Sequence, residues 1–216
     1  MRRSELGRRR FIATGGVAAG ALVVGGGILA VSRADVDLPA PSYSRANGTG
    51  KRTLIAYASK AGSTAEVAVF IGKRLSERGL AVDVCPAKDV KSLDGYAAVV
   101  VGSAIRAGNW LPEATRFVRT HRAALAQAKT AFFSLCMTLQ QDTPKNREIV
   151  TAYLKPVREI LEPLRMESFA GKMDYHKLAL APRLIVKAKN VPEGDFRNWS
   201  AIGAWADALH DEVLVA

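Results

Sequence analysis

The sequence is poor in residues that bind metals or form disulfide frameworks. Its 216 residues include two cysteines and three histidines, and none of them stands at a spacing typical of zinc or iron–sulfur sites. Both well-known glycine-rich nucleotide patterns, GxxxxGK[ST] and GxGxxG, are missing. So are zinc-finger spacing, basic heptads and the aromatic-basic stretch of RNA-binding domains. These absences predict a protein with no metal site and no nucleic-acid partner.

The remaining composition is that of a folded, basic protein. Hydrophobic residues make up 49% of the chain and charged residues 24%, which is typical of a globular domain with a real core. The net charge is +11, of which residues 1–34 carry 6 − 1 = +5 and residues 35–216 the other +6. The folded part is therefore basic in its own right, which favours an anionic membrane surface or a small anionic substrate.

The first 34 residues are predicted to be a targeting segment rather than part of the fold. Residues 8–12, RRRFI, resemble the twin-arginine pattern R-R-x-[FL]-[LI], and an apolar stretch over residues 11–31 is long enough to span a bilayer. Cleavage after Ala34 would give an exported domain, and an uncleaved anchor would give a membrane-tethered one. Both place the domain on the extracytoplasmic side, and association with the cytoplasmic face of the membrane is the alternative. Residues 35–50 are predicted to be a linker, and residues 51–216 the domain.

The central motif is the segment TLIAYASKAGST at residues 53–64. Its first half is a short apolar run typical of a strand buried in a parallel sheet. Its second half offers hydroxyls, a glycine and free backbone N–H groups at the start of a helix, where the helix dipole attracts anions. An ordinary turn capped by Ser63 or Thr64 is the alternative interpretation. The candidate phosphate-binding residues are Ser59, Lys60, Ala61, Gly62, Ser63 and Thr64.

Strand and helix patterns alternate along the rest of the domain. This alternation predicts an α/β doubly wound parallel sheet with helices on both faces, whose ligand lies beyond the carboxyl ends of the strands. Ser200 is expected to cap the last helix, and an apolar stripe through Trp205 is expected to pack in the core. After the first strand, the predicted strands are 81–85, 97–102, 130–135 and 166–170, and the predicted helices are 65–78, 111–126, 142–161 and one beginning near residue 200.

Five blocks carry a resemblance to a known family. Ser59, Ala61, Gly62 and Thr64 match the pattern [ST]-x-T-G-x-T, except that Ala61 replaces a hydroxyl. VVVGSAIRAGNW, TAFFSL, FAGKMDYHKL and PEGDFRNWSAI follow in order. Together they resemble the flavodoxin-domain family that includes the bacterial menaquinone-dependent protoporphyrinogen IX dehydrogenases. The resemblance implies a five-stranded sheet of order 2-1-3-4-5, FMN as cofactor, and a membrane-associated oxidoreductase that passes electrons from protoporphyrinogen IX to a quinone.

The resemblance also implies which residues frame the flavin ring. Gly108 and Asn109 permit the positive φ that a peptide beside a flavin often needs. Trp110 either stacks on the ring or packs at the start of the next helix. No catalytic side chain is predicted, because the flavin itself carries out the redox chemistry. The residues expected to frame the ring are Ser103, Ala104, Ile105, Arg106, Gly108, Asn109 and Trp110 after the third strand, and Leu135, Cys136, Met137 and Thr138 after the fourth.

The cysteines and the surface charge complete the prediction. In the order 2-1-3-4-5, Cys85 and Cys136 lie three strands apart, roughly 14 Å, so both are expected to be free thiols. The basic segment 145–189 would suit porphyrinogen propionates or anionic lipid, whereas a merely solvated basic face is the simpler interpretation. Two other functions stay open, namely a tethered electron carrier that docks with a redox partner and a flavin-fold binding module without activity.

Overall fold

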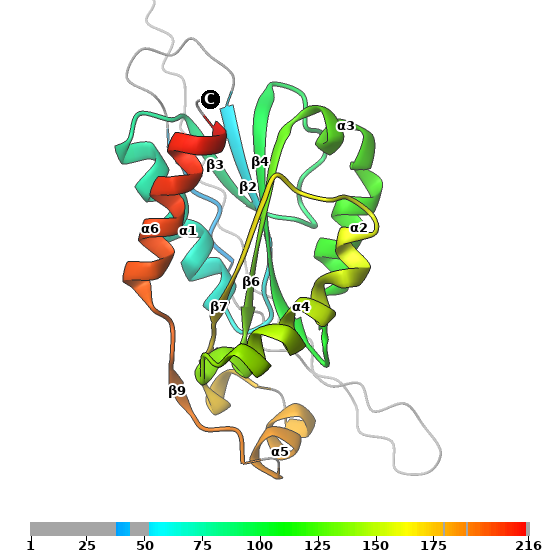
Figure 1. Ribbon diagram of the computed structural model, residues 1–216, viewed down its shortest axis with the longest axis vertical. Helices are drawn as coiled ribbons and strands as arrows, with labels where there is room; N and C mark the ends of the chain where they lie inside the picture. The colour runs from blue at the N-terminus through cyan, green and yellow to red at the C-terminus, as the bar shows by residue number, and fades with distance from the viewer. Residues whose placement is uncertain (1–37, 44–51, 179, 189, 215–216) are drawn as a thin grey trace, which may run out of the picture.

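The computed structural model describes residues 38–43, 52–178, 180–188 and 190–214, and these form an α/β sandwich (Figure 1). Apolar runs form the strands at its centre, and amphipathic segments form the helices around them. The strands are β1 (Ser42–Tyr43), β2 (Arg52–Ala58), β3 (Val82–Pro86), β4 (Tyr96–Arg106), β5 (Asn109–Trp110), β6 (Lys129–Cys136), β7 (Arg165–Ala170), β8 (Lys172–Met173) and β9 (Gly194–Asp195). The helices and turns are α1 (Ser63–Glu77), α2 (Pro112–Thr120), α3 (Arg122–Gln127), η1 (Met137–Gln140), α4 (Pro144–Arg158), η2 (Tyr175–Lys177), α5 (Leu180–Ala188), α6 (Trp199–Leu209) and the π-helical turn η3 (His210–Leu214).

The main sheet has the order β1-β3-β2-β4-β6-β7. Its parallel part, β3-β2-β4-β6-β7, corresponds to the predicted order 2-1-3-4-5. The prediction of a five-stranded, wholly parallel sheet is nevertheless wrong, because β1 adds an antiparallel strand beside β3 and β5 pairs antiparallel with β4. Both additions are only two residues long, too short for a periodic pattern to reveal them.

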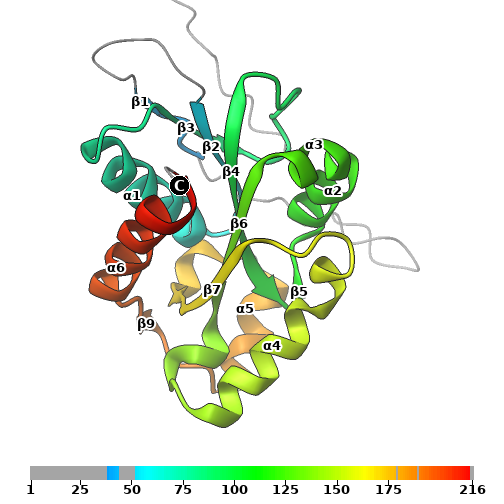
Figure 2. The ribbon, with the colours of Figure 1, turned by 45° about the horizontal axis from the view of Figure 1, so that its top comes forward.

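Helices cover both faces of the sheet, as predicted. Helices α1 and α6 pack on one face, and α2, α3 and α4 cover the other (Figure 2). Successive side chains of β6 enter the two cores on opposite faces of the sheet. Phe132 packs on the α2–α4 side and Phe133 on the α1–α6 side, and both are fully buried. The strands are therefore apolar on both faces, which explains their continuous hydrophobic runs.

Several predicted elements differ from the structure in their bounds or caps, and three of these differences bear on the fold. The third predicted strand continues to Arg106 instead of stopping at Gly102. The predicted helix 111–126 is divided at His121 into α2 and α3. The last helix is capped by Asn198, whose side chain accepts a hydrogen bond from the backbone N–H of Ala201, and not by Ser200. Asparagine is as good a cap as serine, so the sequence alone did not decide between them.

Residues 38–43, which the sequence analysis placed in the linker, pack against the domain. Leu38 and Tyr43 contact the core on the α1–α6 side. The Tyr57 hydroxyl donates a hydrogen bond of 2.6 Å to the carbonyl of Pro39, and the Val84 backbone N–H donates one of 2.9 Å to the carbonyl of Pro41. This short segment therefore closes the β3 edge of the sheet.

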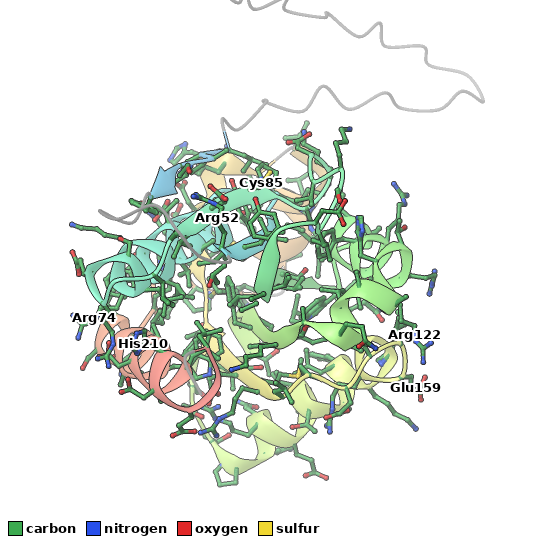
Figure 3. The ribbon with its side chains drawn as sticks, turned by 90° about the horizontal axis from the view of Figure 1, so that it is seen from above. Arg52, Arg74, Cys85, Arg122, Glu159 and His210 are labelled. Atoms are coloured by element: carbon green, nitrogen blue, oxygen red, sulfur yellow. The ribbon has the colours of Figure 1, made fainter. Side chains whose placement is uncertain are left out.

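Ion pairs join the helices and strands at the surface. Arg74 on α1 pairs with Asp207 on α6 at 2.7 Å, and Arg52 on β2 pairs with Asp83 on β3 at 2.5 Å. Seen from above, Arg74 and His210 lie on the α1–α6 side of the molecule, while Arg122 and Glu159 lie on the opposite side (Figure 3). Cys85 and Cys136 are free thiols, and burial raises the pKa of Cys85.

No helix within residues 38–43, 52–178, 180–188 and 190–214 is long and apolar enough to cross a bilayer. The predicted targeting segment, residues 1–34, lies outside these ranges.

Candidate functional site

The parallel register brings three of the predicted segments to one edge of the sheet. Ala58 at the end of β2 is level with Ser103 on β4, and Ser103 is level with Ser134 on β6. The loop after β2, the β4–β5 connection and η1 therefore all leave the carboxyl edge of the sheet. In an open α/β sheet this edge is where ligands bind.

The amino terminus of α1 is open for an anion. Gly62 stands at the cap position with φ 88°, and no side chain caps the helix. Ser59 instead supports the turn from behind, because its hydroxyl accepts a hydrogen bond of 3.0 Å from the Gly62 backbone N–H. The proposed alternative, a turn capped by Ser63 or Thr64, is therefore wrong. Without such a cap, the backbone N–H groups and the positive end of the helix dipole stay directed at this loop.

Thr64 supplies an unused polar atom at the same place. Its side chain is fully buried, and its hydroxyl has no hydrogen-bond partner within the described part of the chain. A buried hydroxyl without a partner is destabilising by about 1–3 kcal/mol. We therefore expect this hydroxyl to bind a ligand. A phosphate at the start of α1 would accept its hydrogen bond, and the loop residues therefore fit the phosphate of FMN.

Two ion-pair networks surround this loop. Lys60 pairs with Glu113 at the start of α2, which links the phosphate loop to the opposite face of the sheet. On the other side, Arg197 pairs with Glu66 in the first turn of α1 at 2.8 Å and donates a hydrogen bond of 3.3 Å to the Ser63 carbonyl. Its side chain is only 3% exposed. These pairs hold the loop in place from both faces.

Arg197 is the site residue that the sequence analysis missed. It lies in the block PEGDFRNWSAI, but nothing in the sequence shows that this block reaches the start of α1. Its guanidinium is fixed by Asp195, at 2.5 Å, and lies 4.5 Å from the centre of the Trp199 ring. The hydrogen bond from Arg197 keeps the pKa of Asp195 below its usual range. Because the Glu66 and Asp195 carboxylates both pair with it, Arg197 fixes the position of the first turn of α1 and adds no net positive charge there.

The β4–β5 connection is a tight hairpin at the end of a strand that continues past residue 102, where the predicted strand ended. Arg106 pairs with Asn109 across a two-residue turn, in which Ala107 and Gly108 have φ values of 49° and 75°. The positive φ values therefore fall one residue earlier than predicted, at Ala107 and Gly108. A turn with two such residues matches the twist of a β-hairpin. Arg106 and Asn109 are exposed at its tip, and Ile105 is half-buried.

Several residues predicted to frame the ring have side chains in the core. The Ser103 hydroxyl accepts a hydrogen bond of 3.0 Å from the Leu111 backbone N–H. Trp110 is 5% exposed and packs against Phe132 with ring centres 5.1 Å apart, and its buried indole N–H has no hydrogen-bond partner within the described residues. Leu135 and Cys136 are buried as well.

The remaining predicted residues lie on partly accessible backbone. Met137 and Thr138 are half-buried in η1, as Ala104 is on β4. The Cys136 thiol accepts a hydrogen bond from the Thr138 backbone N–H and so caps η1. A structural cap explains this cysteine without a chemical role. The hairpin and η1 thus present Ile105, Arg106, Asn109, Met137 and Thr138 at the carboxyl edge.

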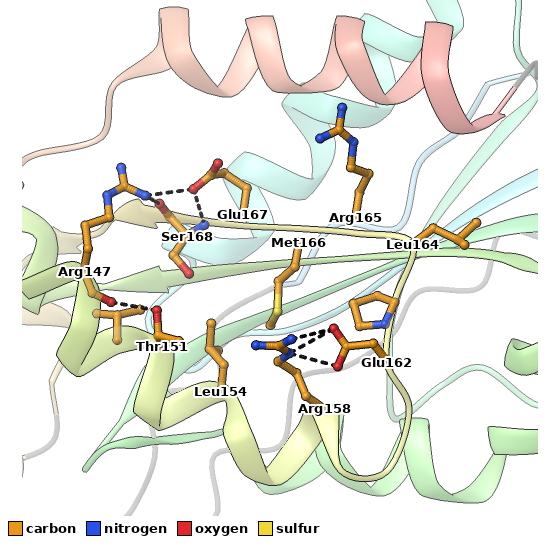
Figure 4. Close-up of a pocket in the computed structure, with 12 residues that line it drawn as sticks. Arg147, Thr151, Leu154, Arg158, Glu162, Leu164, Arg165, Met166, Glu167 and Ser168 are labelled. Atoms are coloured by element: carbon orange, nitrogen blue, oxygen red, sulfur yellow. Dashed lines mark hydrogen bonds and ion pairs between the residues drawn. The ribbon is translucent and has the colours of Figure 1, made fainter. Parts of the chain in front are cut away.

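A cavity of about 380 Å³ lies elsewhere, between α4 and the free edge of β7 (Figure 4). Its charged residues are already paired, Arg147 with Glu167 at 2.9 Å and Arg158 with Glu162 at 2.7 Å. Neither the phosphate loop nor the β4–β5 hairpin lines it. Geometry therefore favours the α1 terminus, and not this cavity, as the functional site.

Fold and site together define a flavodoxin-like α/β protein with an anion-binding loop. The flavodoxin domain family matches residues 54–198, and the chain belongs to this family. A curated relative is protoporphyrinogen IX dehydrogenase [quinone] of Escherichia coli K12, which is 26% identical over 141 residues, 63% of this chain and 77% of the relative.

Similar solved structures include two flavodoxins. The Streptococcus pneumoniae TIGR4 flavodoxin has a TM-score of 0.47 and 16% identity, over 74% of this chain and 99% of that one. Flavodoxin 2 of Bacillus cereus has a TM-score of 0.39 and 26% identity, over 54% of this chain and 84% of that one.

Proposed function

We propose that this protein is an FMN-dependent oxidoreductase that transfers electrons from a porphyrinogen-type substrate to a quinone. The main support for a bound FMN phosphate is the Thr64 hydroxyl, which is buried without a hydrogen-bond partner among the described residues at the uncapped start of α1. Membership of the flavodoxin domain family supports FMN in particular. The similarity to a quinone-linked protoporphyrinogen IX dehydrogenase supports the substrate and acceptor classes.

In this proposal the protein binds and orients, and bound FMN supplies the electron-transfer chemistry. Thr64 and the first backbone N–H groups of α1 hold the phosphate, and the Lys60–Glu113 and Arg197–Glu66 pairs keep the loop in place around it. The β4–β5 hairpin and η1 border the ring. No side chain is assigned as an acid or base.

The test is an anaerobic absorption experiment on the purified protein. Flavin bands should appear in the visible spectrum, bleach when protoporphyrinogen IX is added, and return when a quinone is added afterwards. Bands that never bleach would contradict the substrate assignment and leave the cofactor assignment intact. A protein with no flavin bands even after incubation with FMN would contradict both.

An electron carrier that docks with a protein partner is the second candidate. The exposed Arg106 and Asn109 at the hairpin tip, beside the proposed flavin site, favour it. Reduction of such a partner should slow as salt is added, because charge-steered docking is screened. Salt-independent turnover of a small porphyrinogen would favour the enzyme.

We also propose that residues 1–34 direct the domain to the extracytoplasmic side of a membrane. The twin arginines Arg8 and Arg9 support this proposal. Fractionation of cells that produce the variant R8K/R9K should show retention in the cytoplasm, because such signals are read by a receptor. The variant R2K/R3K should be exported as the unaltered chain is. Equal export of both variants would contradict the proposal.

A further inference from the structure

Helix α5 carries an unusual group of exposed apolar side chains. Leu180, Leu184 and Ile185 are 71%, 59% and 57% exposed. Among the described residues, the one other large hydrophobic with comparable exposure is Leu164, on a different part of the surface. Leu180 and Leu184 lie one turn apart on one side of the helix, and Ile185 lies about 100° further round, so the three side chains form one broad apolar face. We call Leu180, Leu184 and Ile185 the α5 face.

The segment that carries the α5 face is basic between the flanking residues Asp174 and Glu193. Residues 175–191 contain Lys177, Arg183, Lys187 and Lys189 and no acidic residue, a net charge of 4 − 0 = +4. A short helix with an apolar face and flanking lysines and arginines is typical of segments that lie in the interface of an anionic bilayer. Protein–protein interfaces, in contrast, are depleted of lysine around their apolar centres.

The segment that bears α5 is attached to the domain beside the functional site. The short ladder between β8 and β9 closes its base. Tyr175 donates a hydrogen bond to the Val191 carbonyl, and the Lys187 ammonium lies 5.3 Å from the centre of the Tyr175 ring. Lys177 lies 4.0 Å from Glu66, in the first turn of α1. Figure 1 shows α5 beyond the carboxyl ends of the strands, at the same end of the molecule as the start of α4.

We propose that the α5 face inserts into an anionic lipid surface and thereby presents the carboxyl edge of the sheet to the membrane. Leu180, Leu184 and Ile185 enter the acyl boundary, while Arg183 and Lys187 contact lipid phosphates. Insertion of the α5 face into lipid does not depend on redox activity. We further expect that a lipid-soluble electron acceptor reaches the carboxyl edge of the sheet directly from the membrane, and this expectation rests on the proposed function.

The test uses the full chain in vesicles and a tryptophan placed on α5, compared with one placed elsewhere, because the predicted targeting segment could itself bind lipid. A tryptophan is introduced by L184W, and a matched control by L164W. Leu164 is 65% exposed, but its backbone N–H bonds to the Thr130 carbonyl at the amino end of the sheet. Both variants keep the same three native tryptophans. Vesicles contain phosphatidylcholine with or without phosphatidylglycerol, with bromine on the acyl chains as quencher.

In vesicles that contain phosphatidylglycerol, we expect the tryptophan emission of L184W to shift to shorter wavelength and to be quenched. Added salt should reduce both changes. L164W should show neither. Equal quenching of both variants, or no quenching of L184W, would overturn the proposal. So would quenching that is the same without phosphatidylglycerol. Cross-linking of α5 to α5 in place of quenching would assign the face to a second copy of the chain.

A second measurement separates this proposal from the proposed function. In vesicles that contain quinone, L184Q/I185Q should slow quinone reduction about tenfold, whereas L164Q should not. Reduction of a water-soluble acceptor should be the same in all three proteins, which also shows that the variants fold. Quenching of L184W without turnover of any acceptor would refute the proposed function and leave the lipid interface standing. Equal quinone rates in L184Q/I185Q and L164Q would refute the interface.

Discussion

At the scale of single residues, the Thr64 hydroxyl gives the sharpest test of the phosphate site. The substitution Thr64→Val keeps the volume of the side chain and removes an oxygen that has no partner within the described residues. We expect FMN affinity to fall roughly tenfold or more, since a hydrogen bond to a charged group contributes about 1.5–3 kcal/mol. The free energy of unfolding of the apoprotein should stay the same or rise. Fluorescence titration with FMN and urea denaturation measure the two quantities.

Thr130 provides the matched control. Its hydroxyl is also buried, but it donates a hydrogen bond of 2.8 Å to the Leu125 carbonyl. Thr130→Val should therefore lower the free energy of unfolding by about 1 kcal/mol and leave FMN affinity unchanged. If Thr64→Val behaved in the same way as Thr130→Val, the Thr64 hydroxyl would be structural and the phosphate assignment would fail.

Asp83 should govern part of the pH dependence of stability. The hydrogen bond from Arg52 keeps the pKa of Asp83 below its usual value, and Tyr96 donates a further bond of 2.9 Å. A carboxylate with a depressed folded-state pKa stabilises the fold above its unfolded pKa of about 3.9. That stability is lost as the pH falls through the folded-state pKa. Urea denaturation between pH 7 and pH 2 should therefore show a steep decline below about pH 4.

The variant Asp83→Asn should be less stable at pH 7 by about 1–3 kcal/mol and should lose less stability on acidification. Asp89→Asn serves as the comparison, because within the described residues no ion pair or hydrogen bond of the Asp89 side chain occurs. Parallel pH profiles for Asp83→Asn and the unaltered protein would contradict the role given to the Arg52 pair.

At the scale of elements, the packing of the Phe133 ring of β6 over its neighbour β4 depends on Gly102. Gly102 is in register with Phe133, and a Cβ atom at residue 102 would lie 2.0 Å from the Phe133 ring. Because Phe133 is fully buried, its ring has no free space to move into. Gly102→Ala should therefore lower the free energy of unfolding by about 1–3 kcal/mol, measured by urea denaturation.

Gly171 is the matched control for this prediction. A Cβ atom there would meet the Met137 sulfur at 3.6 Å, an ordinary contact distance. Gly171→Ala should change stability by less than about 0.5 kcal/mol. Equal effects of the two substitutions would show that the ring of Phe133 can yield, contrary to the argument from close packing.

At the scale of the whole molecule, the segment 38–43 joins the chain before the domain to the edge of the sheet. A chain that begins at residue 51 lacks β1, the Pro39 and Pro41 carbonyls and the apolar contacts of Leu38. Compared with a chain that begins at residue 35, its free energy of unfolding should be lower by roughly 2–4 kcal/mol. FMN affinity should hardly change, because β1 pairs with the first residues of β3, away from the carboxyl edge. Identical denaturation midpoints would show that this segment adds nothing to stability.

The sequence by itself determined the parallel strands, the helices between them and the residue types of the loop after β2. Continuous apolar runs such as AAVVV have one stable environment, the centre of a covered sheet, and an alternating series of strands and helices allows few topologies. The loop at residues 59–64 was identifiable because its small and hydroxyl-bearing residues follow such a run directly.

Only the tertiary structure decided which groups face the site. Arg197 lies 134 positions after Ser63, and no local pattern connects them. The burial of Trp110 against Phe132 and the hairpin at Ala107 and Gly108 likewise depend on neighbours from other elements. The physical reason is that a local sequence fixes the periodicity of a segment, whereas the direction and partners of its side chains are fixed when the layers pack.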